Sequence, residues 1–180
     1  DLSTIGRYLN NPLTVTAGPT NSIADNVTND YYVVDPSNKF KALTHIIAYY
    51  PDIYAIIFCK TKQIVQKLAE RLINSNFSAD ALHGDLTQEQ RDAVMLKFRT
   101  KNIRLLIATD VAARGIDIDN LTHIIHYNVA DDAEQYIHRS GRTARADKSG
   151  TAITLVCVKV QFKLQNIAST HHIIFHKQLV

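Results

Sequence analysis

Short apolar runs alternate with amphipathic segments along this chain from about residue 31 onward. Runs rich in Ile, Val, Leu and Tyr are typical of buried strands. They lie at residues 31–34, 54–59, 78–82, 104–108, 122–127 and 151–156. Between them, residues 39–49, 63–75 and 88–99 carry apolar side chains three and four positions apart, which is the spacing of a helix with one buried face.

Strands that alternate with helices predict an α/β domain of three layers, with a mainly parallel central sheet covered by helices on both faces. Thr87 and Gln90 match a capping box, which predicts a helix that begins directly after the loop at His83-Gly84-Asp85. We expect residues 26–180 to form this domain and residues 1–25 to be a linker or N-terminal extension. Residues 161–180 read as a partial element that ends on an alternating run, so we expect the domain to be truncated at its C-terminal end.

Polar residues follow three of the predicted strands. They are Lys60-Thr61-Lys62, His83-Gly84-Asp85 and Thr109-Asp110. In open sheets of this class, ligands bind beyond the carboxyl ends of the strands. The sequence therefore predicts that these three loops meet at a binding edge.

An arginine cluster lies at residues 138–145, where Arg139, Arg142 and Arg145 recur at every third position around Gly141. Guanidinium groups stay charged and match phosphate oxygens with two parallel hydrogen bonds, so the cluster indicates a polyanion. The alternative is a solvated helix face. A glycine inside a helix costs about 1 kcal/mol relative to alanine, which favours a close approach of the backbone to another group over that alternative.

Residues 108–117 place a hydroxyl, two carboxylates, an arginine and a glycine directly after a buried strand. Arg114 can reach a facing carboxylate, and Asp117 can accept hydrogen bonds from ribose hydroxyls. Asp110 can equally be the first acidic residue of a helix that binds no ligand, because carboxylates favour helix N-termini. The density of polar groups indicates a site.

Composition restricts the class of protein. The chain has 180 residues, 46% of them hydrophobic, and a net charge of +3, which fits one globular domain whose nucleic-acid contacts would depend on a local patch. Cys59 and Cys157 lie apart in apolar runs, so we expect reduced core cysteines. The absence of a secretory or membrane-spanning pattern leads us to expect a soluble, cytoplasmic protein. We expect no metal site at His171, His172 and His176, because the remaining ligands of a zinc site are missing.

Four segments in order resemble motifs of the C-terminal RecA-like domain of DEAD-box RNA helicases, in the second helicase superfamily. Residues 56–62 are similar to the fourth motif of that family, Gln88-Glu89-Gln90-Arg91 to its QxxR element, residues 108–117 to its fifth motif and residues 136–145 to its sixth. The resemblance covers most of the chain and implies a RecA-like three-layer αβα fold. Ala144 stands where the family often has glycine.

The resemblance also implies roles for single residues. Arg142 and Arg145 would be arginine fingers that reach the phosphates of ATP held by a partner domain, and Gly115 and Asp117 would contribute to ATP binding, with Asp117 at the ribose. Thr61, Gly84, Arg91 and Thr109 would bind the RNA sugar–phosphate backbone without sequence preference. The residues expected to couple the two domains are Arg114, His138, Arg139 and Phe58, with Phe58 packed beneath the fingers or simply in the core.

Neither a GxxxxGK[ST] phosphate loop nor an Asp-Glu-Ala-Asp run occurs in the 180 residues. We therefore expect this chain to hydrolyse no ATP and unwind no RNA alone, and to hold no ATP or Mg²⁺ by itself. A full-length parent, expected to be a monomer, would use both after its N-terminal RecA-like domain closes on this one. Two alternatives remain, a free-standing RNA-binding module and a superfamily 2 motor that acts on DNA.

Overall fold

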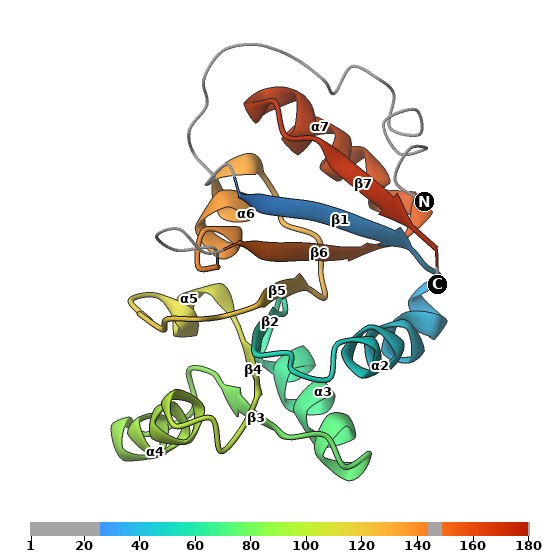
Figure 1. The fold of residues 1–180 in the computed structure, drawn as a ribbon. Helices are drawn as coiled ribbons and strands as arrows, with labels where there is room; N and C mark the ends of the chain where they lie inside the picture. The colour runs from blue at the N-terminus through green and yellow to red at the C-terminus, as the bar shows by residue number, and fades with distance from the viewer. Residues whose placement is uncertain (1–25, 144–148, 180) are drawn as a thin grey trace.

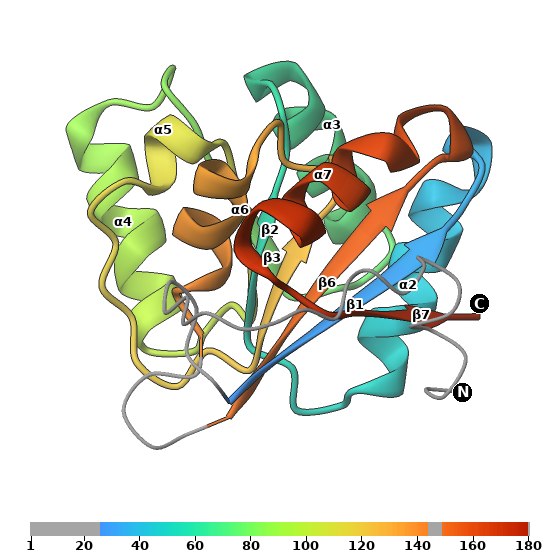
Figure 2. The ribbon, with the colours of Figure 1, turned by 90° about the horizontal axis from the view of Figure 1, so that it is seen from above.

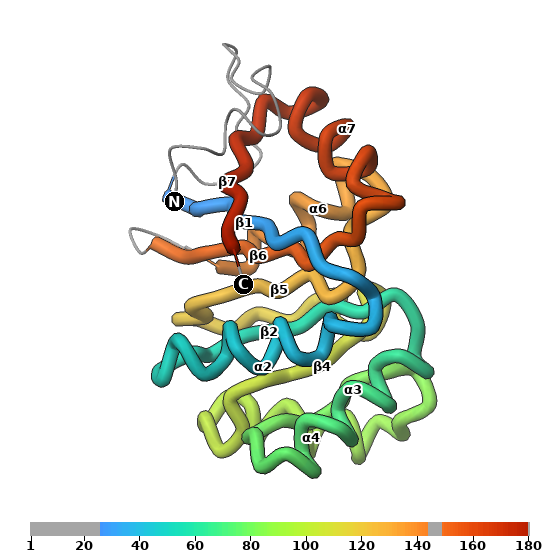
Figure 3. The backbone as a smooth tube through the Cα atoms, turned by 90° about the vertical axis from the view of Figure 1, so that its right-hand side faces the viewer, coloured from blue at the N-terminus to red at the C-terminus, as the bar shows by residue number. Residues whose placement is uncertain are grey.

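Within residues 26–143 and 149–179, which the computed structural model describes, seven parallel strands form one central sheet. The order across the sheet is β3-β4-β2-β5-β6-β1-β7, and the tube view follows it from β7 at one edge toward β4 (Figure 3). The strands are β1 (Val27–Val33), β2 (Ala55–Phe58), β3 (Ala79–Leu82), β4 (Leu105–Ala108), β5 (His123–His126), β6 (Gly150–Val156) and β7 (Phe175–Gln178).

Helices cover both faces of this sheet (Figures 1 and 2). The helices are α2 (Lys39–Tyr49), α3 (Lys62–Asn74), α4 (Gln88–Arg99), α5 (Asp110–Ala113), α6 (Ala133–Ser140) and α7 (Gln161–His171), with short 3₁₀ turns at η3 (Pro36–Asn38) and η4 (Val158–Val160). Neighbouring residues of a strand point to opposite faces. Ile57 accordingly packs in the core beneath α2 and α3, whereas Ile56 packs in the core beneath α4 and α5. A third cluster joins α6 and α7 to the β1 and β6 side of the sheet.

Four helices begin at the same edge of the sheet because each follows a parallel strand and is capped there by a side chain. Thr61, Thr87, Thr109 and Asp132 accept hydrogen bonds from the backbone N–H groups of the first turns of α3, α4, α5 and α6. Thr87 and Gln90 form the predicted capping box, with both reciprocal bonds present. Four helix N-termini therefore lie along one edge, with their backbone donors directed toward it.

The three-layer fold and its parallel sheet are confirmed. All six expected strands are present: four are one or two residues shorter than the apolar runs, whereas β1 and β6 begin earlier than expected, at Val27 and Gly150. The C-terminal tail supplies α7 and the seventh strand, β7. Both cysteines are free thiols, Cys59 buried and Cys157 only partly so, which corrects the expectation of two core residues. No helix in the described ranges has the length and apolar character needed to cross a bilayer. The expected linker at residues 1–25 lies outside the described residues.

Candidate functional site

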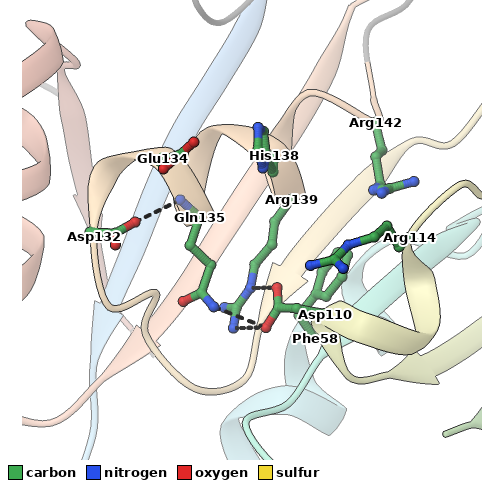
Figure 4. A pocket seen from close by; sticks show the side chains of 9 residues that line it. All are labelled: Phe58, Asp110, Arg114, Asp132, Glu134, Gln135, His138, Arg139 and Arg142. Carbon is green, nitrogen blue, oxygen red and sulfur yellow. Dashed lines mark hydrogen bonds and ion pairs between the residues drawn. The ribbon is translucent and has the colours of Figure 1, made fainter. Parts of the chain in front are cut away.

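A pocket of about 670 Å³ opens between α5 and α6 at the carboxyl ends of β2 and β4 (Figure 4). Its lining combines cationic, anionic and aromatic side chains, namely Phe58, Asp110, Arg114, Asp132, Glu134, Gln135, His138, Arg139 and Arg142. This volume is within the range typical of small-molecule sites. An ion pair between Asp110 and Arg139 forms its floor, and Arg114, from the end of α5, lies near Arg142, from the segment after α6 (Figure 4).

The floor of the pocket is built around Arg139, whose side chain is only 3% exposed. Its Nε and Nη2 donate to the two carboxylate oxygens of Asp110 at 2.7 and 2.9 Å, and Nη1 donates to the Asn128 carbonyl at 2.8 Å. The guanidinium carbon also lies 5.3 Å from the centre of the Phe58 ring. Gln135, from the same helix as Arg139, donates to Asp110 at 3.2 Å. Arg139 is thus bound inside the domain and ties α6 to α5.

Behind Arg139 lies His126, the last residue of β5, with no exposed surface. Its Nδ1 is 3.2 Å from Arg139 Nη1, and its Nε2 is 2.9 Å from Ser140 Oγ. Burial, reinforced by the adjacent guanidinium, lowers the pKa of His126 well below its usual range. The ring stacks on Tyr136 at 4.5 Å, and the Tyr136 hydroxyl donates to Asn29 of β1 at 2.7 Å. Hydrogen bonds and one ring stack therefore link β1 to α5.

Arg142 lies two residues beyond the end of α6 and is partly exposed at the pocket. Its Nη1 donates to the Ile116 carbonyl at 2.8 Å, in the loop that follows α5. That loop turns at Gly115, whose φ of +82° disfavours any residue with a side chain, and then presents the exposed Asp117. Thr143, which follows Arg142 in the chain, is buried, and its hydroxyl donates to the Leu121 carbonyl at 2.7 Å. The side chain of Arg142 is thus held by the Ile116 carbonyl, and its backbone by the hydrogen bond of the adjacent Thr143.

A second group of the predicted residues lies along the neighbouring strand ends, toward β3. Thr61 and Thr109 are the N-caps of α3 and α5, Gly84 is exposed in the loop before α4, and Arg91 lies partly buried in the first half of α4. Lys62 bridges two of these loops through an ion pair with Asp85 at 3.0 Å. The strands that end here, β3, β4 and β2, are adjacent in the sheet. These residues form an edge rich in backbone donors, separate from the residues that line the pocket.

The structure brings five of the predicted residues together as pocket lining: Phe58, Arg114, His138, Arg139 and Arg142. Arg145 lies outside the described residues. The solvated-face alternative fails for Arg139, because its guanidinium is buried. Phe58 is 1% exposed in the core and faces that same Arg139, so a coupling role for either residue would act through the floor of the pocket.

Sequence reasoning missed the α6 side chains Glu134 and Gln135, the cap Asp132, and the buried His126 behind them. A signal for α6 was available, because Asp132 and Gln135 stand three positions apart, as in a capping box. The position of His126 had no comparable signal, because its partners are 13 and 14 residues away in the chain.

The donor set fits part of a nucleotide. Arg114 and Arg142 can donate to phosphate oxygens, and the exposed Asp117 can accept from ribose hydroxyls. Among the residues that the structure describes, no cluster of three or more His, Cys, Asp or Glu side chains could hold a metal ion. The arginines of the pocket can supply positive charge to phosphate.

Comparison with known proteins yields a consistent group of relatives. The family described as "Helicase conserved C-terminal domain" matches residues 38–147. The DEAD-box ATP-dependent RNA helicase CshA of Geobacillus kaustophilus is 38% identical over 167 residues, which are 93% of this chain and 34% of that relative. The chain thus spans about a third of the length of the curated relatives it matches.

Solved structures agree with this result. A DEAD box protein from Methanococcus jannaschii has a TM-score of 0.79 and 39% identity, over 85% of this chain and 42% of that one. Saccharomyces cerevisiae Dbp5, solved with RNA and ADP BeF3, has a TM-score of 0.83 and 28% identity, over 92% of this chain and 45% of that one. In both cases the match covers less than half of the solved protein.

Proposed function

Because this chain belongs to the helicase conserved C-terminal domain family, and within it to the DEAD-box RNA helicases, we propose that it supplies arginine fingers and part of an RNA-binding edge to a two-domain ATPase. The observation that carries this proposal is the pocket between α5 and α6, which Arg114 and Arg142 line beside the buried Arg139–Asp110 pair, with Arg142 bonded to the Ile116 carbonyl. The 180 residues contain no phosphate loop, so the triphosphate and Mg²⁺ would be held by the N-terminal RecA-like domain of the parent.

The chemical task of the arginines is electrostatic. Phosphoryl transfer spreads negative charge over the oxygens of the transferred group, and a guanidinium that meets this charge raises the rate by about 10³ to 10⁵. The bond of Arg142 to the Ile116 carbonyl, and the hydrogen bond that anchors the neighbouring Thr143, support this role. Arg145, three residues further on, would be the second finger. Asp117, after the turn at Gly115, would hold the ribose.

Coupling between the two domains would use the rim of the pocket. Arg114 and His138 are exposed there and can contact the facing domain when it closes. Arg139 and Phe58 are buried beneath them, so they would support this contact from below rather than cross to the other domain.

RNA would bind at the neighbouring edge formed by Thr61, Gly84, Arg91 and Thr109. Helix N-termini present backbone N–H groups to anions, and α3 and α4 both begin here. Contacts to phosphate and sugar carry no direct sequence information and weaken as salt rises. The absence of a side chain at Gly84, which has open space around it, lets a backbone approach closely.

The proposal is tested by steady-state ATPase assays on the two-domain parent at saturating RNA. Arg142→Ala should lower kcat by a factor on the order of 10³ with the fold intact. Arg99→Ala, at the exposed C-terminal end of α4, removes the same charge away from the pocket and should leave kcat unchanged. An unchanged rate in Arg142→Ala would refute the finger role, and turnover by the isolated chain that Arg145→Ala abolishes would refute its dependence on a second domain.

The alternative of a free-standing RNA-binding module is separated by filter binding. A helicase half should bind single-stranded RNA weakly until both domains close around it. Submicromolar binding of single-stranded RNA by the isolated chain would instead favour the module. A preference for single-stranded DNA over RNA in the parent would favour the DNA motor.

A further inference from the structure

His126 occupies an unusual place for a polar side chain. It ends β5, near the middle of the sheet, and its ring has no exposed surface. The ring stacks nearly parallel to Tyr136, at 4.5 Å and 9°, and its centre is 6.5 Å from that of Phe58. A buried imidazole is costly unless both nitrogens are hydrogen-bonded. Both are bonded here, and the two partners decide which nitrogen carries the proton.

The proton assignment follows from the chemistry of arginine. A guanidinium has five N–H donors and no acceptor, so Nδ1 of His126 must be the acceptor of the 3.2 Å contact with Arg139 Nη1. The proton of the neutral ring is then on Nε2, which donates to Ser140 Oγ at 2.9 Å. A protonated ring would set an N–H against an N–H and place two cations side by side. The neutral Nε2–H form is therefore the one that this site accepts.

His126 also limits how Arg139 can turn. The two hydrogens of Nη1 are accounted for by His126 Nδ1 and the Asn128 carbonyl. With Nη1 held in this way, Nε and Nη2 face Asp110 and form a bidentate ion pair with its carboxylate. Loss of the acceptor at position 126 would leave one hydrogen of Nη1 buried without a partner. Rotation of the guanidinium toward another acceptor would break the pair with Asp110.

We infer that His126 is a positioning residue for the proposed ATPase reaction, which it serves by fixing the guanidinium of Arg139 against Asp110. This inference rests on the proposed function, because the Arg139–Asp110 pair ties α6 to α5 and Arg142 lies two residues beyond the end of α6. The hydrogen bond from His126 to Ser140 holds the last turn of the same helix. His126 thus acts on Arg142 through its contacts with Arg139 and Ser140, the last two residues of α6.

Two substitutions separate this role from simple packing. His126→Asn puts its side-chain oxygen near the position of Nδ1, so it keeps the acceptor for Arg139 while it gives up the ring. His126→Leu keeps an apolar side chain in the core but removes the acceptor. A packing role predicts that Leu is tolerated at least as well as Asn. A positioning role predicts that Asn restores function and Leu does not.

The kinetic test measures kcat and KM for ATP in the two-domain parent at saturating RNA. His126→Leu should lower kcat by roughly 10- to 100-fold with KM changed much less, because a displaced finger affects the transition state most. His126→Asn should recover most of that loss. Equal kcat values for the two variants, or a defect confined to KM, would overturn the inference.

A second measurement needs no activity and stays informative if His126→Leu fails to fold. In ¹⁵N NMR spectra of the unmodified chain at neutral pH, Nε2 of His126 should resonate as a protonated nitrogen and Nδ1 as an unprotonated one. The Arg139 Nε–H should be visible and slow to exchange, and His126→Asn should preserve it. The opposite tautomer, or a protonated ring, would overturn the inference. Lack of RNA-stimulated ATPase activity in the unmodified parent would instead refute the proposed function and leave this result standing.

Discussion

Replacement of Asp110 by Asn tests whether the buried pair with Arg139 holds α5 and α6 together. The change keeps the shape of the side chain but removes its charge and turns one acceptor oxygen into an N–H donor. Arg139 makes two of its four hydrogen bonds to this carboxylate, and its side chain is only 3% exposed. Removal of one partner of a buried ion pair costs about 3–5 kcal/mol. Because Asp110 is 29% exposed and Asn keeps one acceptor, we expect a loss of about 2–3 kcal/mol in the free energy of unfolding.

A matched control is available in the same chain. Asp85 pairs with Lys62 at 3.0 Å, but these side chains are 55% and 45% exposed. Asp85→Asn makes the same chemical change in an exposed pair and should cost about 0–1 kcal/mol, and less at high salt.

Urea unfolding followed by circular dichroism measures both variants. With an m-value of about 2 kcal/mol/M, Asp110→Asn should lower the midpoint by about 1 M and the control by less than half of that. If the losses in free energy of unfolding of the two variants differed by less than about 0.5 kcal/mol, the Asp110–Arg139 pair would not be what holds α5 and α6 together.

Three further predictions concern other parts of the chain. A Cβ at Gly150 would lie 2.0 Å from Thr143 Oγ1, so Gly150→Ala should lower the free energy of unfolding, measured in urea, by about 2–4 kcal/mol. Gly84 has open space around it, so Gly84→Ala should change that free energy by no more than about 0.5 kcal/mol. Burial raises the pKa of Cys59 to about 12, so at pH 8 this thiol should resist alkylation, followed by mass spectrometry, until the chain unfolds; rapid labelling of the native chain would contradict this. Arg91→Ala should weaken RNA binding by the parent equally across sequences and reduce the salt dependence by about one phosphate contact; an unchanged slope in a salt titration would exclude that contact.

The sequence predicted the elements whose signals are local. The helices expected at residues 39–49 and 88–99 have those bounds in the structure, because their apolar periodicity and, for the second, its capping box are encoded within a few residues. Four of the six strands are shorter than the apolar runs that predicted them, because flanking residues such as Tyr54 and Cys59 are buried without pairing as part of a strand, whereas β1 and β6 begin earlier than predicted. The eight residues of α6 are too few for a clear periodicity, and its polar residues bind partners from α5, β5 and β1 that only the fold brings near.

The arginine cluster shows why residue type and spacing alone could not assign its members. Residues three apart on a continuous helix lie on one face, so Arg139 and Arg142 would be expected to share an environment. Instead α6 ends at Ser140 and is followed by Gly141, whose φ of −69° needs no glycine but where a Cβ would lie 3.0 Å from the Ile137 carbonyl oxygen. The chain leaves the helix there. Arg139 therefore points into the buried network, while Arg142 reaches the Ile116 carbonyl at the side of the pocket. Because the helix ends between them, Arg139 binds inside the domain and connects α6 to α5, whereas Arg142 lies at the pocket, where an arginine can contact a phosphate.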